Sequence, residues 1–274
     1  MNLNASNAGQ VTLGANTSEP ITVNRIGLGT NRITDTEQAH AVLRRAVELG
    51  VNFIDTAELY QGTRSEDTIG KTLAPYPKGV IIATKVGMSL VDSSPINDPD
   101  YMRNAVNASL ARLRLERIPL YQLHRVDSNV PIPQTARVLK EMQDEGKVLH
   151  IGLSEVNVEQ IKEFRKTIDV ASVQNNYNVG ERKYEIVLNY CEAEGIVFIP
   201  FYPLAKKKPI SAAHQEIADK HGVSLSQIAI AWLLRRSVVM LPIPGTLSVE
   251  HLEQNVAAGQ IELSDEDFER LSQS

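Results

Sequence analysis

An acid and a phenol, two groups that can exchange protons, stand five residues apart after a short apolar run. The run, residues 51–54, follows Gly50 and has the length and composition of a buried strand. Asp55 then falls at the carboxyl end of this strand and Tyr60 on the loop beyond, where α/β proteins carry their reactive groups. The pair therefore indicates a reactive site, although an aspartate here also caps helices and a lone tyrosine often only packs.

Other predicted strands also end in polar side chains. These side chains are Thr84, Lys85, His124, Ser154, Glu155, Gln174 and Asn175. Taken alone, each has an ordinary explanation, such as a solvated lysine or a hydrogen-bonded core histidine. If the strands close into one barrel, however, all of them converge on the same mouth. An aspartate, a tyrosine, a lysine and a histidine in one mouth predict a catalytic site.

The elements that would position these residues alternate along the chain. Apolar runs typical of buried strands lie at residues 25–29, 51–54, 80–84, 120–123, 148–153, 171–174, 196–201 and 238–242. Helical patterns lie between and after them at residues 35–49, 65–73, 99–113, 133–145, 158–166, 184–194, 211–221 with 224–235, and 248–257.

This alternation predicts an α/β fold, a (β/α)8 TIM barrel formed as one domain by residues 1–274. Strands that are apolar throughout are typical of parallel strands covered on both faces. The alternating segment 11–24 predicts an N-terminal β-hairpin ahead of the barrel. A doubly wound sheet is the structural alternative, but GLGTNR at 27–32 lacks the third glycine of a dinucleotide fingerprint.

Composition narrows the range of partners. The net charge is -5 and the one basic run, residues 206–208, is short, which argues against nucleic acid or an anionic membrane as a partner. A single cysteine, Cys191, excludes an internal disulfide and a cysteine zinc cluster, and we predict no metal site. Without a long apolar stretch or a secretory signal, we expect a cytoplasmic protein.

Three motifs carry a family resemblance. FIDTAELY at 53–60, IIATK at 81–85 and LYQLH at 120–124 resemble the catalytic motifs of the aldo-keto reductases, and the resemblance extends over essentially the whole chain. It implies a catalytic tetrad of Asp55, Tyr60, Lys85 and His124. The segment IPGTLSVEHLEQN at 243–255 is similar to the bacterial branch that includes pyridoxal reductases.

The same resemblance implies NADP(H) as the cofactor. Ser154 and Gln174 would bind the nicotinamide amide, Phe201 would stack on its ring, and Gly29 and Thr30 would meet the cofactor at the first strand. The sequence departs from the family pattern in two regions. Glu155 stands where many members carry asparagine. At the 2′-phosphate, where many members present Lys and Arg, the matching residues here are Gly245, Thr246 and His251; Thr246 and His251 are our candidates for phosphate binding.

These residues suit carbonyl reduction by hydride transfer. Tyr60 would protonate the alkoxide as it forms, and a nearby Lys85 cation, held by Asp55, would lower the pKa of the tyrosine. His124 would donate a hydrogen bond to the carbonyl oxygen. The substrate would be a small carbonyl compound chosen by the loops 86–98, 125–131 and 203–210. We expect a monomer or a weak oligomer.

Two other functions are compatible with parts of this pattern. Lys85 at a barrel strand end could form a Schiff base with a carbonyl substrate, as in class I aldolases. That alternative leaves Tyr60 and the nicotinamide motifs without a role. A non-catalytic, cofactor-sensing subunit is the second alternative, and the complete tetrad argues against it.

Overall fold

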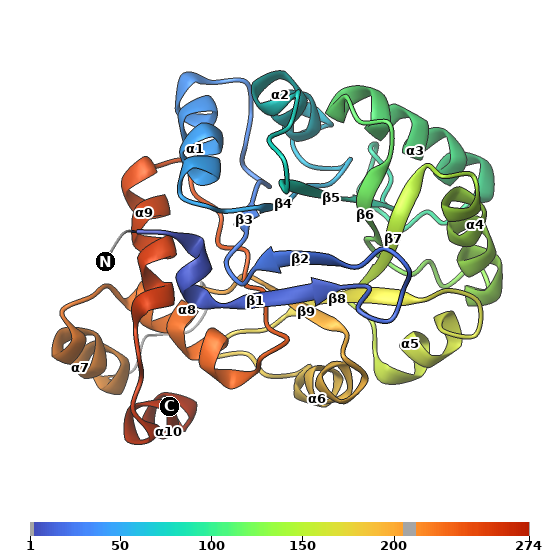
Figure 1. Ribbon diagram of the computed structural model, residues 1–274. Helices are drawn as coiled ribbons and strands as arrows, with labels where there is room; N and C mark the ends of the chain where they lie inside the picture. The colour runs from blue at the N-terminus through green and yellow to red at the C-terminus, as the bar shows by residue number, and fades with distance from the viewer. Residues whose placement is uncertain (1–2, 205–211, 274) are drawn as a thin grey trace.

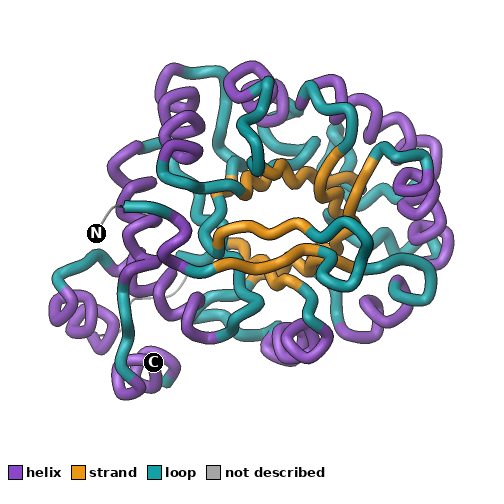
Figure 2. Tube along the Cα trace, in the orientation of Figure 1, coloured by secondary structure: helices purple, strands orange, loops and turns teal. Residues whose placement is uncertain are grey.

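The computed structural model describes residues 3–204 and 212–273. Within these residues, seven parallel strands form one sheet in which each strand pairs with the next along the chain. The strands are β3 (Leu28–Gly29), β4 (Phe53–Asp55), β5 (Ile81–Val86), β6 (Ile118–Leu123), β7 (Val148–Ser154), β8 (Val170–Asn176) and β9 (Val197–Phe201). They curve around a central axis with helices on the outside (Figures 1 and 2).

The outer helices follow the strands in chain order. They are α1 (Glu37–Glu48), α2 (Arg64–Leu73), α3 (Pro99–Leu113), α4 (Ile132–Asp144), α5 (Val158–Phe164), α6 (Glu185–Glu194), α7 (Ala212–His221), α8 (Leu225–Arg236) and α9 (Val249–Ala257). The predicted (β/α)8 barrel is confirmed, and most predicted element boundaries lie within about two residues of those observed. None of the helices in the described ranges is long and apolar enough to cross a membrane.

The eighth predicted strand, 238–242, lies in a closing segment, residues 238–244, that completes the barrel without forming a regular strand. Within the described residues, its one ladder contact is a parallel bridge between Phe198 and Met240. On its other side, the Pro242 carbonyl accepts from Gly27 N at 3.0 Å and the Pro244 carbonyl accepts from Gly29 N at 3.4 Å. Proline has no backbone N–H, so this segment accepts hydrogen bonds from its neighbour without being able to build a complete ladder.

Gly29 is required at this seam. A Cβ on Gly29 would lie 2.6 Å from the Ile243 carbonyl oxygen, closer than real Cβ contacts allow. The missing side chain therefore lets the first strand approach the closing segment. Gly29 is also the last residue of β3, so the same close approach forms one wall of the barrel mouth.

The predicted N-terminal hairpin is present and closes the opposite end of the barrel. Strands β1 (Gln10–Leu13) and β2 (Ile21–Asn24) pair antiparallel, with Val11 opposite Val23. They lie across the barrel end that faces the viewer in Figure 1. Val11, Leu13 and Val23 pack against interior residues near the amino ends of the strands, including Phe53 and Leu120. The amino end of the barrel is therefore filled, which leaves the carboxyl end for a site.

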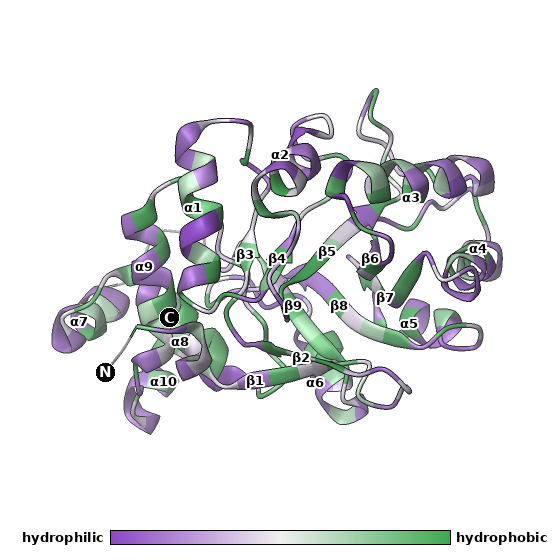
Figure 3. Ribbon diagram, turned by 45° about the horizontal axis from the view of Figure 1, so that its top comes forward, coloured by the Kyte–Doolittle hydropathy of each residue, from purple (hydrophilic) through white to green (hydrophobic). Residues whose placement is uncertain are grey.

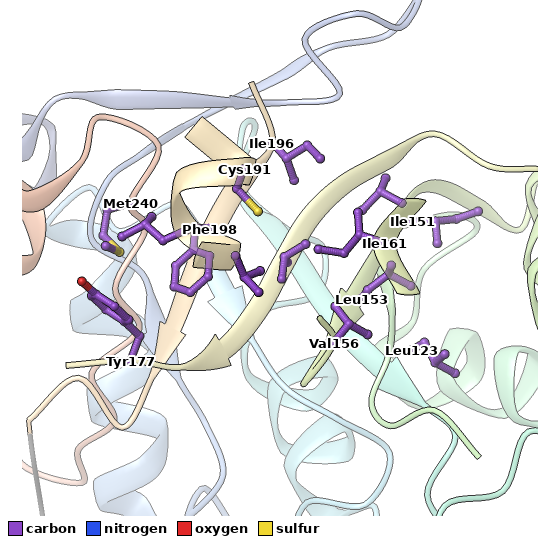
Figure 4. Close-up of a cluster of buried hydrophobic side chains, with 14 of the residues drawn as sticks. Leu123, Ile151, Leu153, Val156, Ile161, Tyr177, Cys191, Ile196, Phe198 and Met240 are labelled. Atoms are coloured by element: carbon purple, nitrogen blue, oxygen red, sulfur yellow. The ribbon is translucent and has the colours of Figure 1, made fainter. Parts of the chain in front are cut away.

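The main core lies between the sheet and the helices. Figure 4 shows part of it, where Leu123, Leu153 and Ile161 lie close together. Aromatic rings extend the same core, with Tyr177 in an edge contact to Phe198 at 5.7 Å between ring centroids. In Figure 3, β9 is largely hydrophobic, whereas outer helices such as α1 and α4 mix hydrophilic and hydrophobic residues. This is the pattern expected when only one face of a helix is buried.

Three short elements were not predicted from the sequence. They are the 3-10 helices η1 (Ala5–Ala8) and η2 (Ala258–Gln260) and the last helix, α10 (Asp265–Ser272). Ser264 caps α10 by accepting from Asp267 N. The Asp267 carboxylate in turn accepts from Lys220 at 2.9 Å, and Trp232 Nε1 donates to Ser272 Oγ at 2.8 Å. These contacts to α7 and α8, which a local pattern does not reveal, hold this short helix on the barrel.

Candidate active site

A cavity of about 240 Å³ opens at the carboxyl ends of the strands. Most of the predicted site residues line it, namely Gly29, Thr30, Asp55, Tyr60, His124, Ser154, Gln174 and Phe201. Lys85 is fully buried directly behind Tyr60 and Asp55. The structure therefore brings the four predicted catalytic residues and five of the predicted cofactor residues to one place.

The two-residue period of the strands explains why these side chains share one interior. On β4, Phe53 packs into the apolar layer beneath the site and Asp55, two residues later, points into the site. On β6, Leu120 lies in the apolar layer and Gln122 reaches Asp55. The barrel interior thus has an apolar layer, which packs against the N-terminal hairpin, and a polar layer above it at the barrel mouth.

Lys85 is the centre of this polar layer. Its Nζ donates to Asp55 Oδ1 at 2.6 Å, to the Thr56 carbonyl at 2.8 Å and to the Tyr60 hydroxyl at 3.1 Å. Three protein acceptors therefore use the three N–H groups of the ammonium. Because the lysine and aspartate side chains are buried almost completely, the ion pair is shielded from solvent and fixed in position.

Two glutamines hold the aspartate from the other side. Gln122 Nε2 donates to Asp55 Oδ2 at 3.0 Å, and Gln174 Nε2 donates to the same oxygen at 2.8 Å. Gly152, on the strand between them, leaves the space that this arrangement needs, because a Cβ there would lie 2.9 Å from Gln122 Cγ. Gln122 was not predicted as a site residue, although its position two residues before His124 places it on the same interior face.

Burial and charge act in opposite directions on Lys85 and Tyr60. Burial lowers the pKa of Lys85, but Asp55 and Tyr60 raise it more, so the net shift is upward and the ammonium stays charged. For Tyr60, burial raises the pKa and Lys85 only partly offsets it, so the net shift is also upward. Lys85 thus acts in the predicted direction, but the predicted net lowering of the tyrosine pKa is wrong, because desolvation outweighs the lysine charge.

His124 is a neutral imidazole in this site. Burial, followed by the charges of Lys85 and Arg125, lowers its pKa to about 2. The ring meets Tyr60 edge to face with 5.9 Å between centroids. Its side chain makes no hydrogen bond to any residue in the described ranges. The one N–H group of the neutral ring is therefore available to donate to a ligand in the cavity.

The depressed pKa of His124 predicts a specific pH dependence of stability. In the unfolded chain a histidine binds a proton below about pH 6.5, whereas the folded imidazole stays neutral down to about pH 2. Lowering the pH from about 6.5 therefore favours unfolding, by up to about 1.4 kcal/mol per pH unit. In His124→Gln this contribution disappears, so we expect a shallower loss of unfolding free energy between about pH 6 and pH 5.

Urea denaturation of both proteins across this range measures the two slopes. The comparison uses slopes, so a constant packing loss in the variant does not affect it. Equal slopes for the wild type and His124→Gln would mean that the imidazole is protonated in the folded protein.

Ser154, Phe201 and Thr30 differ in what they offer to the cavity. Ser154 is buried at the end of β7 and accepts a hydrogen bond from Arg125 at 3.1 Å. Phe201 ends β9 with a partly exposed ring that lines the cavity. The Thr30 hydroxyl, by contrast, donates to the Asp55 carbonyl at 2.8 Å and contacts Ser65. Its side chain therefore mainly ties the first strand to its neighbours.

The predicted phosphate residues lie outside the cavity lining. The Thr246 hydroxyl accepts from Ser248 N at 3.0 Å. His251 is exposed in the first turn of α9, and its backbone N–H donates to Ser248 Oγ. Gly245, just before them, does line the cavity. The basic run 206–208 and most of the predicted loop 203–210 lie outside the described residues.

Glu155 turns away from the cavity. It follows β7 in a left-handed conformation with φ of 54°. Its carboxylate accepts from Asn176 N at 2.8 Å and from the Tyr184 hydroxyl at 3.3 Å. The residue that departs from the family pattern therefore braces β8 and the loop before α6 and does not line the cavity.

The cavity lining also includes two arginines that were not predicted as site residues. Arg125 follows His124, and its Nη1 donates to the His124 carbonyl and to Ser154 Oγ. Arg32 lies at the other end, where its Nη2 donates to the Gly245 carbonyl at 2.8 Å. Their positions just after strand ends were the available signal, but the direction of a long side chain depends on its three-dimensional neighbours.

Comparison with known proteins agrees with this geometry. The Aldo/keto reductase family model matches residues 25–274. An uncharacterised oxidoreductase of Schizosaccharomyces pombe is 44% identical over 99% of this chain and 91% of its own length. Pyridoxine 4-dehydrogenase of Escherichia coli is 36% identical over 89% of this chain and 92% of its own.

A solved structure supports the same assignment. The aldo-keto reductase from Klebsiella pneumoniae in complex with NADPH superposes with a TM-score of 0.83 at 26% identity, covering 100% of this chain and 95% of that one. The match extends over the barrel and its closing segment, not over a single motif. This chain therefore belongs to the aldo/keto reductase family.

Proposed function

We propose that this protein is an NADP(H)-dependent oxidoreductase that reduces aldehydes or ketones to alcohols, with Tyr60 as the general acid. One observation carries the proposal: Lys85 Nζ lies 2.6 Å from Asp55 and 3.1 Å from the Tyr60 hydroxyl, and that tyrosine opens into a cavity beside His124. A charged lysine shared by an acid and a phenol is the arrangement needed to protonate an alkoxide as it forms.

When bound, the nicotinamide cofactor supplies the hydride. Tyr60 stays protonated at working pH because burial raises its pKa, so the proton is available for the substrate oxygen. As that proton leaves, the Lys85 ammonium stabilises the phenolate. The neutral His124 ring donates a hydrogen bond to the carbonyl oxygen and fixes its orientation. Asp55 keeps the lysine charged and in place.

The residues on the opposite wall fit a nicotinamide. The Ser154 hydroxyl accepts from Arg125, which leaves its own hydrogen to donate to the amide oxygen. Gln174 uses Nε2 on Asp55, so its carbonyl oxygen remains available to the amide N–H group. Phe201 offers a ring face for stacking. The relative from Klebsiella pneumoniae was solved with NADPH, which favours the phosphorylated cofactor.

The cofactor phosphates would lie toward the seam of β3 and the closing segment. Arg32 supplies a permanent cation there, and Gly29 and Gly245 let the backbone approach closely. Thr246 and His251, which follow Gly245 at the start of α9, remain candidates for the 2′-phosphate.

We further propose that the chain forms one barrel domain and acts in the cytoplasm as a monomer or weak oligomer. Its substrates would be small aldehydes, and the relative named pyridoxine 4-dehydrogenase favours pyridoxal-like compounds.

The Schiff-base alternative is not favoured. A lysine must lose its proton to attack a carbonyl, but Asp55 and Tyr60 raise the pKa of Lys85 despite its burial. All three of its N–H groups are already donated to protein acceptors. A cofactor-sensing role without catalysis leaves the contact between Lys85 and Tyr60 without a use.

Turnover with purified protein tests the proposed function. We expect consumption of NADPH, followed as loss of nicotinamide absorbance, with pyridoxal and other small aldehydes, and a slower reaction with NADH. Tight NADPH binding without turnover of any carbonyl compound would instead favour the sensing subunit. A borohydride-stable adduct on Lys85 would favour the Schiff-base enzyme.

A further inference from the structure

Arg125 is the one guanidinium on the His124 side of the cavity within the described residues, and the proposed hydride transfer does not use it. It follows His124 directly, lines the cavity and is partly buried. No carboxylate of the described chain forms an ion pair with it. Asp55, the one acidic residue in the described cavity lining, is already neutralised by Lys85. The cavity therefore holds an uncompensated positive charge next to the proposed reacting atoms.

The backbone of Arg125 is held by a buried cross-link between two loops. Asn97 Nδ2 donates to the Arg125 carbonyl at 3.1 Å, and Asn97 Oδ1 accepts from Asp127 N at 2.7 Å. Asn97 itself is completely buried. The loops 86–98 and 125–131, which were predicted to choose the substrate, are thus joined at the base of this arginine.

The guanidinium has one edge engaged and one edge available. Nη1 donates both to the His124 carbonyl and to Ser154 Oγ. Within the described chain, Nε and Nη2 make no hydrogen bond. These two N–H groups point the same way and match the two oxygens of a carboxylate.

The guanidinium also lies over an aromatic ring of the cavity lining. The Arg125 guanidinium carbon lies 5.9 Å from the centroid of Phe201, at the ring proposed to stack on the nicotinamide. Its charge also acts on both groups proposed to contact the carbonyl oxygen. It opposes the upward shift that burial gives the pKa of Tyr60. It adds to the downward shift that burial and Lys85 give the pKa of His124. Arg125 therefore lies near both the ring proposed to stack on the nicotinamide and the two groups proposed to contact the carbonyl oxygen.

We propose that Arg125 is a specificity-determining residue that binds a carboxylate on the substrate and so selects carbonyl compounds that carry an acidic group. The proposal rests on the proposed carbonyl reduction and names the substrate class for it. A bidentate, charge-assisted hydrogen bond to this partly buried guanidinium contributes enough to favour a charged over a neutral substrate by about 10- to 100-fold in kcat/KM.

A matched pair of substrates tests the selection. We would compare kcat/KM for 4-carboxybenzaldehyde and its neutral amide, 4-formylbenzamide, at saturating NADPH. We expect the wild type to prefer the carboxylate by about 10-fold or more. Arg125→Met should lower this ratio to about one, and Arg125→Lys should retain part of it because a lysine keeps the charge without the planar fork.

A control separates a local contact from a general effect of charge. Arg64→Met removes one positive charge from the exposed first turn of α2, outside the cavity lining, and should leave the ratio at its wild-type value. A ratio near one in the wild type, or the same ratio in wild type and Arg125→Met, would overturn the proposal while leaving carbonyl reduction in place. Failure to reduce either aldehyde, together with the other carbonyl compounds, would overturn the proposed function instead.

The NADPH dissociation constant gives a second readout. If Arg125 binds the cofactor phosphates rather than a substrate carboxylate, Arg125→Met will weaken NADPH binding strongly and leave the substrate ratio unchanged. That outcome would also overturn the proposal. We expect a changed ratio with NADPH affinity altered much less.

Discussion

Tyr60→Phe is expected to lower kcat/KM for carbonyl reduction by about 10²- to 10⁴-fold, the range typical for loss of a general acid. The substitution removes the hydroxyl that accepts from Lys85 at 3.1 Å and keeps the ring that packs against His124. Because the ring stays, the shape of the cavity is retained. The NADPH dissociation constant should therefore remain close to that of the wild type.

Steady-state kinetics and fluorescence titration of NADPH measure the two quantities separately. Substantial turnover by Tyr60→Phe would assign the proton donor to another group. Weakened NADPH binding with unchanged kcat would place the hydroxyl in the cofactor site instead. Both outcomes are distinguishable from simple misfolding, because a misfolded variant would lose turnover and cofactor affinity together.

Lys85→Met is expected to damage both stability and catalysis. It leaves the Asp55 carboxylate buried without its cation, which typically costs about 3–5 kcal/mol of unfolding free energy. It also removes the charge that stabilises the Tyr60 phenolate, so kcat should fall together with stability. Urea denaturation and steady-state kinetics on the same preparation measure the two losses.

The double variant Lys85→Met with Asp55→Asn separates them. Asparagine keeps one oxygen to accept from Gln122 and Gln174 but carries no charge, so much of the lost stability should return. Activity should stay low, because the ammonium beside Tyr60 is still missing. Recovery of activity along with stability would mean that Lys85 serves only to balance the charge of Asp55.

The place of the proposed catalytic residues could be predicted because it depends on local patterns. An apolar run of strand length followed by a polar residue puts that residue at a strand end, and parallel strands of a barrel bring such ends to one mouth. Asp55, Lys85 and His124 each satisfy this rule. The motif around Tyr60 placed the phenol on the adjoining loop, and the structure finds it in contact with Lys85.

Closure of the barrel was only partly predictable. The sequence contains an apolar segment at 238–242 and two prolines, Pro242 and Pro244, but the pattern alone favours a regular eighth strand. In the structure the segment accepts hydrogen bonds from Gly27 and Gly29 without forming a full ladder. Proline lacks the donor that a full ladder requires, and which neighbour approaches it is a property of the closed barrel.

The amino-acid sequence by itself determined the alternation of strands and helices, the barrel class and the proposed catalytic groups at its mouth, because periodicity and residue type act over a few neighbouring positions. Only the tertiary structure decided the direction of the Tyr60 pKa shift, the hydrogen bond from Asn176 N to the Glu155 carboxylate and the hydrogen bond from Arg125 to Ser154. Each depends on how deeply a group is buried and on partners far along the chain, such as Lys85 for Tyr60 and Ser154 for Arg125. Desolvation and long-range contacts arise only when the chain is folded, so no local pattern encodes them.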